Sequence, residues 1–203
     1  MNEIQEEIIQ IEWNQFQKVN NQGGRAGCQD DWQQFHIMRL SQFLAWPEEL
    51  LESYLNDLEE ADASGSNLIF NKYAYMMEVT DPEGYRKICH VLPEITPVQR
   101  EQMEKTVQIQ VKWAETFAKE YPNFAGNGRP IHQYEERFGW TSVETYQRGE
   151  LYSYGTETQK LYCKFIETCE KEHRNLTYEV REHMAKMYGY ASLEDAERRT
   201  NVR

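Results

Sequence analysis

A chain of 203 residues can fold as one large domain or two small ones, and at this length folding buries roughly 70% of the surface of the unfolded chain. Its 34 acidic and 22 basic side chains give a net charge of -12, which would repel a phosphate backbone and excludes nucleic acid as an expected partner. No apolar run reaches the length of about 18 residues that spans a bilayer. The start of the chain is acidic where a secretory signal is basic, so we expect a cytoplasmic protein with no membrane partner.

The cysteines indicate neither a zinc site nor a disulfide framework. Cys28, Cys89, Cys163 and Cys169 form no Cys-x-x-Cys pair. Cys163 and Cys169 fall in a predicted helix, where we expect reduced thiols in the core, whereas Cys28 lies in a glycine-rich loop. The sequence therefore points to no metal site, and it identifies no cofactor.

Helical patterns fill the first half of the chain. Residues 3–19 are rich in Glu, Gln and Ile, contain neither Gly nor Pro, and end in a run of Asn, Gln and Gly that is typical of a helix terminus. A second helix is predicted from Gln29 to Trp46, and Pro47 opens a third that continues to about Ala63. Two further helical segments are predicted before residue 92.

A boundary is predicted at residues 93–97, where two prolines interrupt any helix that would cross. Beyond it the sequence predicts a long helix to about Glu120, capped by Thr96, and three more helices near residues 141–153, 157–172 and 177–188. No segment alternates apolar and polar residues as a strand does. We therefore predict an all-α bundle of about seven to nine helices, a single domain over residues 1–203 in which units 1–92 and 97–203 are joined by the proline-containing linker.

Two patterns occur twice in the same order. The segment from Ile9 to Trp13 recurs from Ile109 to Trp113, and each copy is followed by a loop that begins with Gly-Arg and ends with Gln, at residues 24–29 and 128–133. Arg39 and Arg148, and the pairs Asn67-Leu68 and Asn175-Leu176, are weaker correspondences. An internal duplication with a pseudo-two-fold axis would explain the repeat, and chance similarity between amphipathic helices is the alternative.

Ionisable side chains fall on helix faces that should be buried. In projection at 3.6 residues per turn, Glu12 points into the apolar face of the first helix, and His36 and Arg39 lie within the apolar face of the second. If these helices form an antiparallel hairpin, a rise of about 1.5 Å per residue places Glu12 level with both. A Glu12–Arg39 ion pair is expected, because an unpaired buried charge is too costly.

Two interpretations of this cluster remain open. The first is a structural ion pair that fixes the register of the helices. The second is a polar pocket in which Arg39 and Arg25 hold an anionic group and the catalytic candidates Glu12 or His36 handle a proton. In the second interpretation, replacing Arg39 by Met abolishes ligand binding with a modest loss of stability.

The candidate site extends over both glycine loops. Lys112 replaces Glu12 in the second unit and lies outside the apolar face, so we expect one site in the first half, completed by the second loop. The candidate ligand-binding residues are Trp13, Arg25, Cys28, Gln29, Trp32, Arg39, Arg129, His132 and Gln133.

The segment from Asn21 to Asp31, together with Trp13, the run Ile37-Met38-Arg39 and the stretch Leu51-Glu52-Ser53-Tyr54-Leu55, resembles a bacterial family known as domain of unknown function 4125. The resemblance covers nearly the whole chain, including residues 128–131 and Tyr188-Gly189-Tyr190. It implies that the glycine loops matter, but it implies no activity.

Two functions follow from these expectations. The first is a protein that binds, or acts on, a small polar or anionic metabolite at the Gly-Arg loop. The second is a helical interaction module, in which an exposed aromatic patch binds a protein partner or a second copy of the chain. The residues of that patch would be Trp140, Tyr146, Tyr152 and Tyr154.

Overall fold

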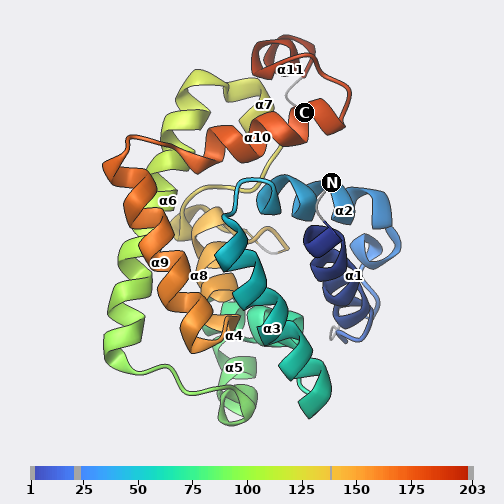
Figure 1. Ribbon diagram of the computed structural model, residues 1–203, viewed down its shortest axis with the longest axis vertical. Helices are drawn as coiled ribbons and strands as arrows, with labels where there is room; N and C mark the ends of the chain where they lie inside the picture. Colours follow the sequence, from blue (N-terminus) through green and yellow to red (C-terminus); the bar gives the residue numbers. More distant parts are fainter. Residues whose placement is uncertain (1–2, 21–23, 138, 201–203) are drawn as a thin grey trace.

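The structure, a computed structural model, describes residues 3–20, 24–137 and 139–200. In this part of the chain it contains eleven α-helices and no β-strand, so the all-α class is confirmed (Figure 1). The predicted number of seven to nine helices is too low. The two unforeseen helices, α7 (Pro122–Gly126) and α11 (Leu193–Arg199), are too short for a hydrophobic period to be recognised in the sequence.

The first half contains α1 (Glu3–Gln17), α2 (Trp32–Phe43), α3 (Glu48–Ser64), α4 (Leu68–Thr80) and the short α5 (Pro82–Ile88). α2 begins at Trp32 rather than at Gln29, because Gln29 belongs to the 3-10 helix η1 (Gly27–Asp30). The side chain of Asp31 then caps α2 by accepting a hydrogen bond from the backbone N–H of Gln34. Gly65 ends α3 with a φ of 74°, the left-handed conformation that glycine adopts readily.

The second half contains α6 (Pro97–Glu120), α8 (Val143–Ser153), α9 (Thr156–Lys171) and α10 (Leu176–Met187) in addition to α7 and α11. Thr96 caps α6 as predicted, in a reciprocal arrangement with Gln99. Asn67 and Asn175 cap α4 and α10, each through a side-chain oxygen that accepts a hydrogen bond from a backbone N–H of the first turn.

The helices of the two halves pack in the same pattern. α1 packs against α2, α3 and α4, and α6 packs against α8, α9 and α10. Between the halves, α3 packs against α9, α4 against α8, and α10 against α2. Figure 1 shows α9 alongside α6 and α10 lying above α2. Among these eight helices, exchanging the two halves leaves the set of contacts unchanged, whereas the contacts of α7 with α6 and α11 have no counterpart in the first half.

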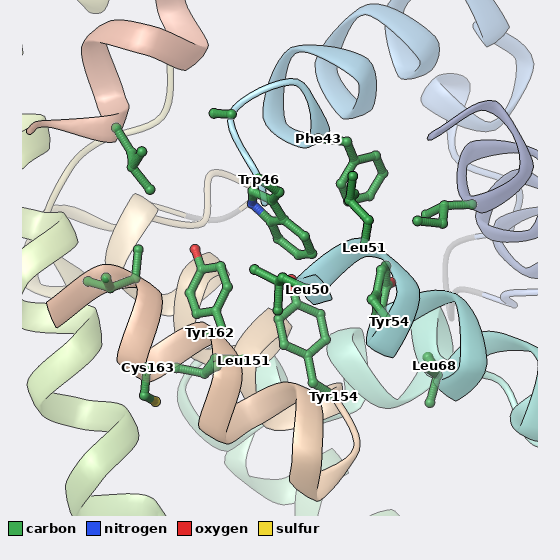
Figure 2. Close-up of a cluster of buried hydrophobic side chains, with 14 of the residues drawn as sticks. Phe43, Trp46, Leu50, Leu51, Tyr54, Leu68, Leu151, Tyr154, Tyr162 and Cys163 are labelled. Carbon is green, nitrogen blue, oxygen red and sulfur yellow. The ribbon is translucent and has the colours of Figure 1, made fainter. Parts of the chain in front are cut away.

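The main hydrophobic core lies where α3 meets α9 and the end of α8. Trp46, Tyr54, Tyr154 and Tyr162 contact one another there with ring centroids 4.9 to 6.0 Å apart (Figure 2). Cys163 and Cys169 are buried free thiols, as expected, whereas Cys28 is exposed. None of the described helices has both the length and the apolar character needed to cross a bilayer.

Gly149 allows α4 and α8 to approach closely. A Cβ atom built on Gly149 would lie 2.8 Å from the backbone oxygen of Lys72 and 2.5 Å from the side chain of Met76. This contact brings Glu150, the next residue of α8, against α4 and into the centre of the molecule, where it is 2% exposed.

Candidate ligand-binding site

A network of buried charges joins four helices at the centre of the molecule. Arg39 donates two hydrogen bonds of 2.6 Å to the carboxylate of Glu12, which forms the expected ion pair. Arg39 also donates to Glu150 at 2.8 Å, and Lys72 donates to the other oxygen of Glu150 at 3.0 Å. The hydroxyl group of Tyr54 donates to Glu12 at 2.6 Å. Two carboxylates and two cations thus balance within the core.

The electrostatics of this network fix its protonation. Burial alone would lower the pKa of Arg39, but the carboxylates of Glu12 and Glu150 raise it well above its usual value. Burial alone would raise the pKa of Glu150, but Arg39 and Lys72 hold it well below its usual value. Burial and the charge of Glu12 raise the pKa of Tyr54. Each charge of this network therefore has a partner of opposite charge.

Sequence reasoning missed Lys72, Glu150 and Tyr154 as members of this network. Tyr154 donates to Glu150 at 3.0 Å and lies 4% exposed. Glu150 precedes the apolar pair Leu151-Tyr152, and Lys72 lies in the apolar stretch of α4. Projecting α4 and α8 as α1 and α2 were projected would have placed both charges on buried faces.

His36 lies outside the network. Its Nε2 is 3.0 Å from Glu6 of α1, and its ring lies 5.4 Å from that of Trp32. Trp32 in turn contacts Trp13 at a centroid distance of 5.3 Å, so these two predicted wall residues are neighbours. His36 and Trp32 therefore belong to the aromatic flank of α1 and α2 rather than to a pocket around Arg39.

The first Gly-Arg loop is held by its own hydrogen bonds. Arg25 donates to Asp30 at 2.9 Å, to the backbone oxygen of Gln29 at 2.8 Å and to Gln17. The buried side chain of Gln29 donates to the backbone oxygens of Phe16, in the last turn of α1, and of Val19, just beyond it. The Nε and Nη2 donors of Arg25 are thus used within the α1–α2 connection.

A cavity of about 650 Å³ lies beside the second Gly-Arg loop, between α6, α7, α10 and the start of α8. Its wall is partly apolar, with Phe117 and Val143, and partly cationic. Glu12, Arg39 and Glu150 do not line it. The residues of this wall that bear on the chemistry are Phe117, Arg129, His132, Arg137, Trp140 and Arg181.

Three arginines line this cavity without an acidic partner. Arg129, Arg137 and Arg181 make no ion pair with any carboxylate in the described part of the chain. Burial lowers the pKa of Arg181, an effect that Tyr188 partly opposes. Nη1 of Arg181 donates to the sulfur of Met184 at 3.7 Å, and the guanidinium group lies 6.0 Å from the centre of the Phe117 ring. Its guanidinium group is thus half-buried with most of its donors available.

Arg129 connects the cavity to the centre of the molecule. It donates to the backbone oxygen of Thr141 at 3.2 Å, and its guanidinium group lies 4.5 Å from the centre of the Tyr146 ring. The ammonium group of Lys72 lies 3.8 Å from the centre of the same ring. Tyr146 is therefore shared by a cation of the cavity and a cation of the buried network.

Both loops also influence Tyr73 in α4. Burial raises the pKa of Tyr73, and the nearby Tyr146 and Cys28 raise it further. The guanidinium groups of Arg129 and Arg39 act in the opposite direction. One residue of each Gly-Arg loop, Cys28 of the first and Arg129 of the second, thus acts electrostatically on Tyr73.

The remaining candidates of the second loop have partners. Nε2 of His132 lies 3.1 Å from the carboxylate of Glu115, and its ring is stacked on Tyr134. Gln133 accepts a hydrogen bond from Arg148 at 3.4 Å and does not line the cavity. Glu135, which does, accepts from the backbone N–H groups of the loop, at Ile131 and His132.

The prediction that these four aromatic residues form an exposed patch is wrong. Tyr152 is 2% exposed and Tyr154 is 4% exposed, because both lie on the face of α8 and the following turn that packs into the core. Trp140 is 59% exposed, but it lies at the cavity. Tyr146 lies between Lys72 and Arg129.

The comparisons with known proteins place the chain in a family. The family model described as "Protein of unknown function (DUF4125)" matches residues 2–198. No curated protein and no solved structure matches the chain.

Proposed function

We propose that this chain, which belongs to the DUF4125 family, binds a small anionic metabolite in the cavity beside its second Gly-Arg loop. The observation that carries the proposal is the convergence of Arg129, Arg137 and Arg181 on one cavity without acidic partners in the described part of the chain. In a protein with a net charge of -12, carboxylates are abundant, so three unpaired guanidinium groups at one place call for a specific reason.

A bound anion would supply that reason. Burying a guanidinium group without a partner costs free energy, and a carboxylate or phosphate group restores the lost interaction through paired hydrogen bonds. Arg181 comes from α10 and Arg129 from the loop before α8, so an anion between them would be held from two sides. Arg129 and Arg137 are exposed, so they would act at the rim, and the cost of burial applies to the half-buried Arg181.

The buried network is the weaker place for a ligand. Each charge of Glu12, Arg39 and Glu150 already has a partner within 3.0 Å. The proposal is therefore one of binding at the second loop, with the Glu12–Arg39 pair in a structural role. We propose no reaction, because His132, the imidazole in the wall of the cavity, is occupied by Glu115.

We further propose that the chain arose by internal duplication. The matching helix contacts of the two halves are what a pseudo-two-fold axis between α3 and α9 would produce. Asn67 donates to the backbone of α1, at Gln15, and Asn175 donates to the backbone of α6, at Trp113. Superposition of α1 to α4 on α6 and α8 to α10 tests this, and failure of the four helices to overlay would refute it.

Duplication would explain why only one half has the cavity. Tyr73 and Arg181 are each the sixth residue after the Asn that caps their helix. In the first half, Tyr73 packs with Phe16 in an aromatic cluster. In the second half, Arg181 occupies the equivalent position and faces a cavity.

A thermal-shift experiment tests the binding proposal. Wild-type protein is heated with phosphate, citrate or a panel of anionic metabolites, alongside Arg181→Met and the control Arg86→Met. Arg86 is exposed, has no ion pair in the described residues and does not line the cavity. At 100 times its dissociation constant a ligand adds about 2.7 kcal/mol, which raises the melting temperature by roughly 5–10 °C. The wild type and Arg86→Met should shift and Arg181→Met should not. Equal shifts in all three proteins, or no shift with any anion, would overturn the proposal.

A further inference from the structure

Two exposed aromatic side chains stand at the rim of the cavity. Trp140 is 59% exposed and Tyr134 is 82% exposed, and both line the cavity. Large aromatic rings at the surface of a polar protein often mark a contact surface, because their burial against a ligand releases a large apolar area. Neither ring belongs to a hydrophobic cluster of the described core.

The Tyr134 ring is packed on one of its faces against another side chain. One face lies on the imidazole of His132, with centroids 4.9 Å apart and planes 9° from parallel. His132 is in turn fixed by Glu115 at 3.1 Å. With an exposed fraction of 82%, Tyr134 offers its other face to solvent as a preformed flat platform.

Trp140 is positioned by the backbone of the same segment. The backbone N–H of Trp140 donates to the backbone oxygen of Arg137 at 2.8 Å, within an isolated antiparallel bridge between the two residues. The segment is anchored further by Glu136, whose carboxylate accepts from both the N–H and the hydroxyl group of Ser142. The turn thus places an indole ring and the guanidinium group of Arg137 at one rim.

The floor of the cavity is also aromatic. Phe117 of α6 lines it and is 2% exposed, and Arg181 lies over its ring. The cavity therefore combines two kinds of surface. Guanidinium groups suit an anionic group, and flat apolar rings suit a planar ring of the ligand.

We infer that the ligand is an anion joined to a planar ring, whose charged group lies between Arg129 and Arg181 and whose ring lies against Trp140 and Tyr134. This inference rests on the proposed anion binding at the cavity. An aromatic carboxylate and a nucleoside monophosphate share this chemistry.

Matched probe pairs test the inference. Adenosine 5′-monophosphate is compared with ribose 5-phosphate, and 2-naphthoate with acetate, by titration calorimetry on the full chain. The ring-bearing member of at least one pair should bind about tenfold more tightly, since stacking on an aromatic side chain contributes about 1–3 kcal/mol and a factor of ten corresponds to 1.4 kcal/mol. The pair that shows the preference identifies the source of the anion. Equal affinities within both pairs would overturn the inference and leave the proposed anion site standing, whereas no binding of any probe would overturn both.

Variants of the two rim residues test where the ring of the ligand binds. Trp140→Ala and Tyr134→Ala should each weaken the ring-bearing probe about tenfold and leave the ring-free probe unchanged. Phe70→Ala is the control, because Phe70 is 36% exposed and lies outside the cavity. Circular dichroism checks that each variant is folded, as expected for substitutions of exposed side chains. An unchanged affinity of the ring-bearing probe for both rim variants would overturn the assignment.

Discussion

Arg39 of α2 binds Glu12 of α1 through two hydrogen bonds of 2.6 Å, and both side chains are buried. The same guanidinium group reaches across to Glu150 in the other half of the chain. This single side chain therefore neutralises two carboxylates that have no access to bulk water. Its removal would leave Glu12 with one uncharged partner, Tyr54.

Replacing Arg39 by Met should lower the free energy of unfolding by roughly 3–5 kcal/mol, because it leaves a buried carboxylate unpaired. Urea unfolding followed by circular dichroism measures the change. Lys105→Met is the control, since the fully exposed Lys105–Glu101 pair should contribute little to stability. A loss below about 1 kcal/mol for the Arg39 variant would contradict the structural role of the network.

Stability should fall in acid because of Glu150. Its pKa in the folded protein lies well below the usual value of 4.5, so the unfolded chain binds the proton first as the pH falls. The stabilising contribution is complete above about pH 4.5 and is lost progressively below it. Urea unfolding between pH 3 and pH 7 measures this slope, and Glu150→Gln should flatten it. A variant with the wild-type slope would show that other carboxylates dominate acid unfolding.

Replacing Gly149 by Ala should destabilise the protein by roughly 1–3 kcal/mol. Alanine is the better helix former by about 1 kcal/mol, but its Cβ would lie 2.8 Å from the backbone oxygen of Lys72, which cannot move without displacing α4. Gly27→Ala is the control, because a Cβ there meets no atom within 4 Å. Unfolding midpoints in urea compare the two variants, and equal midpoints would mean that the α4–α8 contact yields easily.

Replacing Arg181 by Met should stabilise the ligand-free protein by about 1 kcal/mol, since ligand-binding groups are commonly kept at the expense of stability. The comparison is Arg148→Met, which should destabilise, because Arg148 pairs with Glu104 at 2.6 Å and with Glu144 at 3.1 Å. Differential scanning calorimetry without added anions measures both. A destabilised Arg181 variant would indicate a structural role for this side chain.

Most helices were predictable from local sequence patterns. The ion pair between Glu12 and Arg39 was predictable as well. Glu12 and Arg39 lie on consecutive helices, and projecting each helix places both charges on apolar faces that meet, although residues 18–31 separate the helices. His36 was wrongly placed beside them. In the structure it pairs with Glu6, six residues before Glu12 in α1, whereas an antiparallel hairpin would have placed it nearer the residues after Glu12.

Contacts between the halves were beyond the reach of sequence patterns. Lys72 and Glu150 are 78 residues apart, and their pairing depends on the crossing of α4 and α8 at Gly149. The cavity is likewise a product of tertiary packing, because α6, α7 and α10 each contribute part of its wall. The sequence did single out Arg129 and His132, through the repeated Gly-Arg loop, but Arg181 carried no local signal.

The placement of Glu150 has a consequence for synthesis. When the first half of the chain leaves the ribosome, it carries Arg39, Lys72 and Glu12, a set with an excess of one positive charge that is buried in the finished protein. The balancing carboxylate is made only after residue 149. The first half therefore gains its last electrostatic partner late, and we expect it to stay open to solvent, within reach of chaperones, until α8 has been translated.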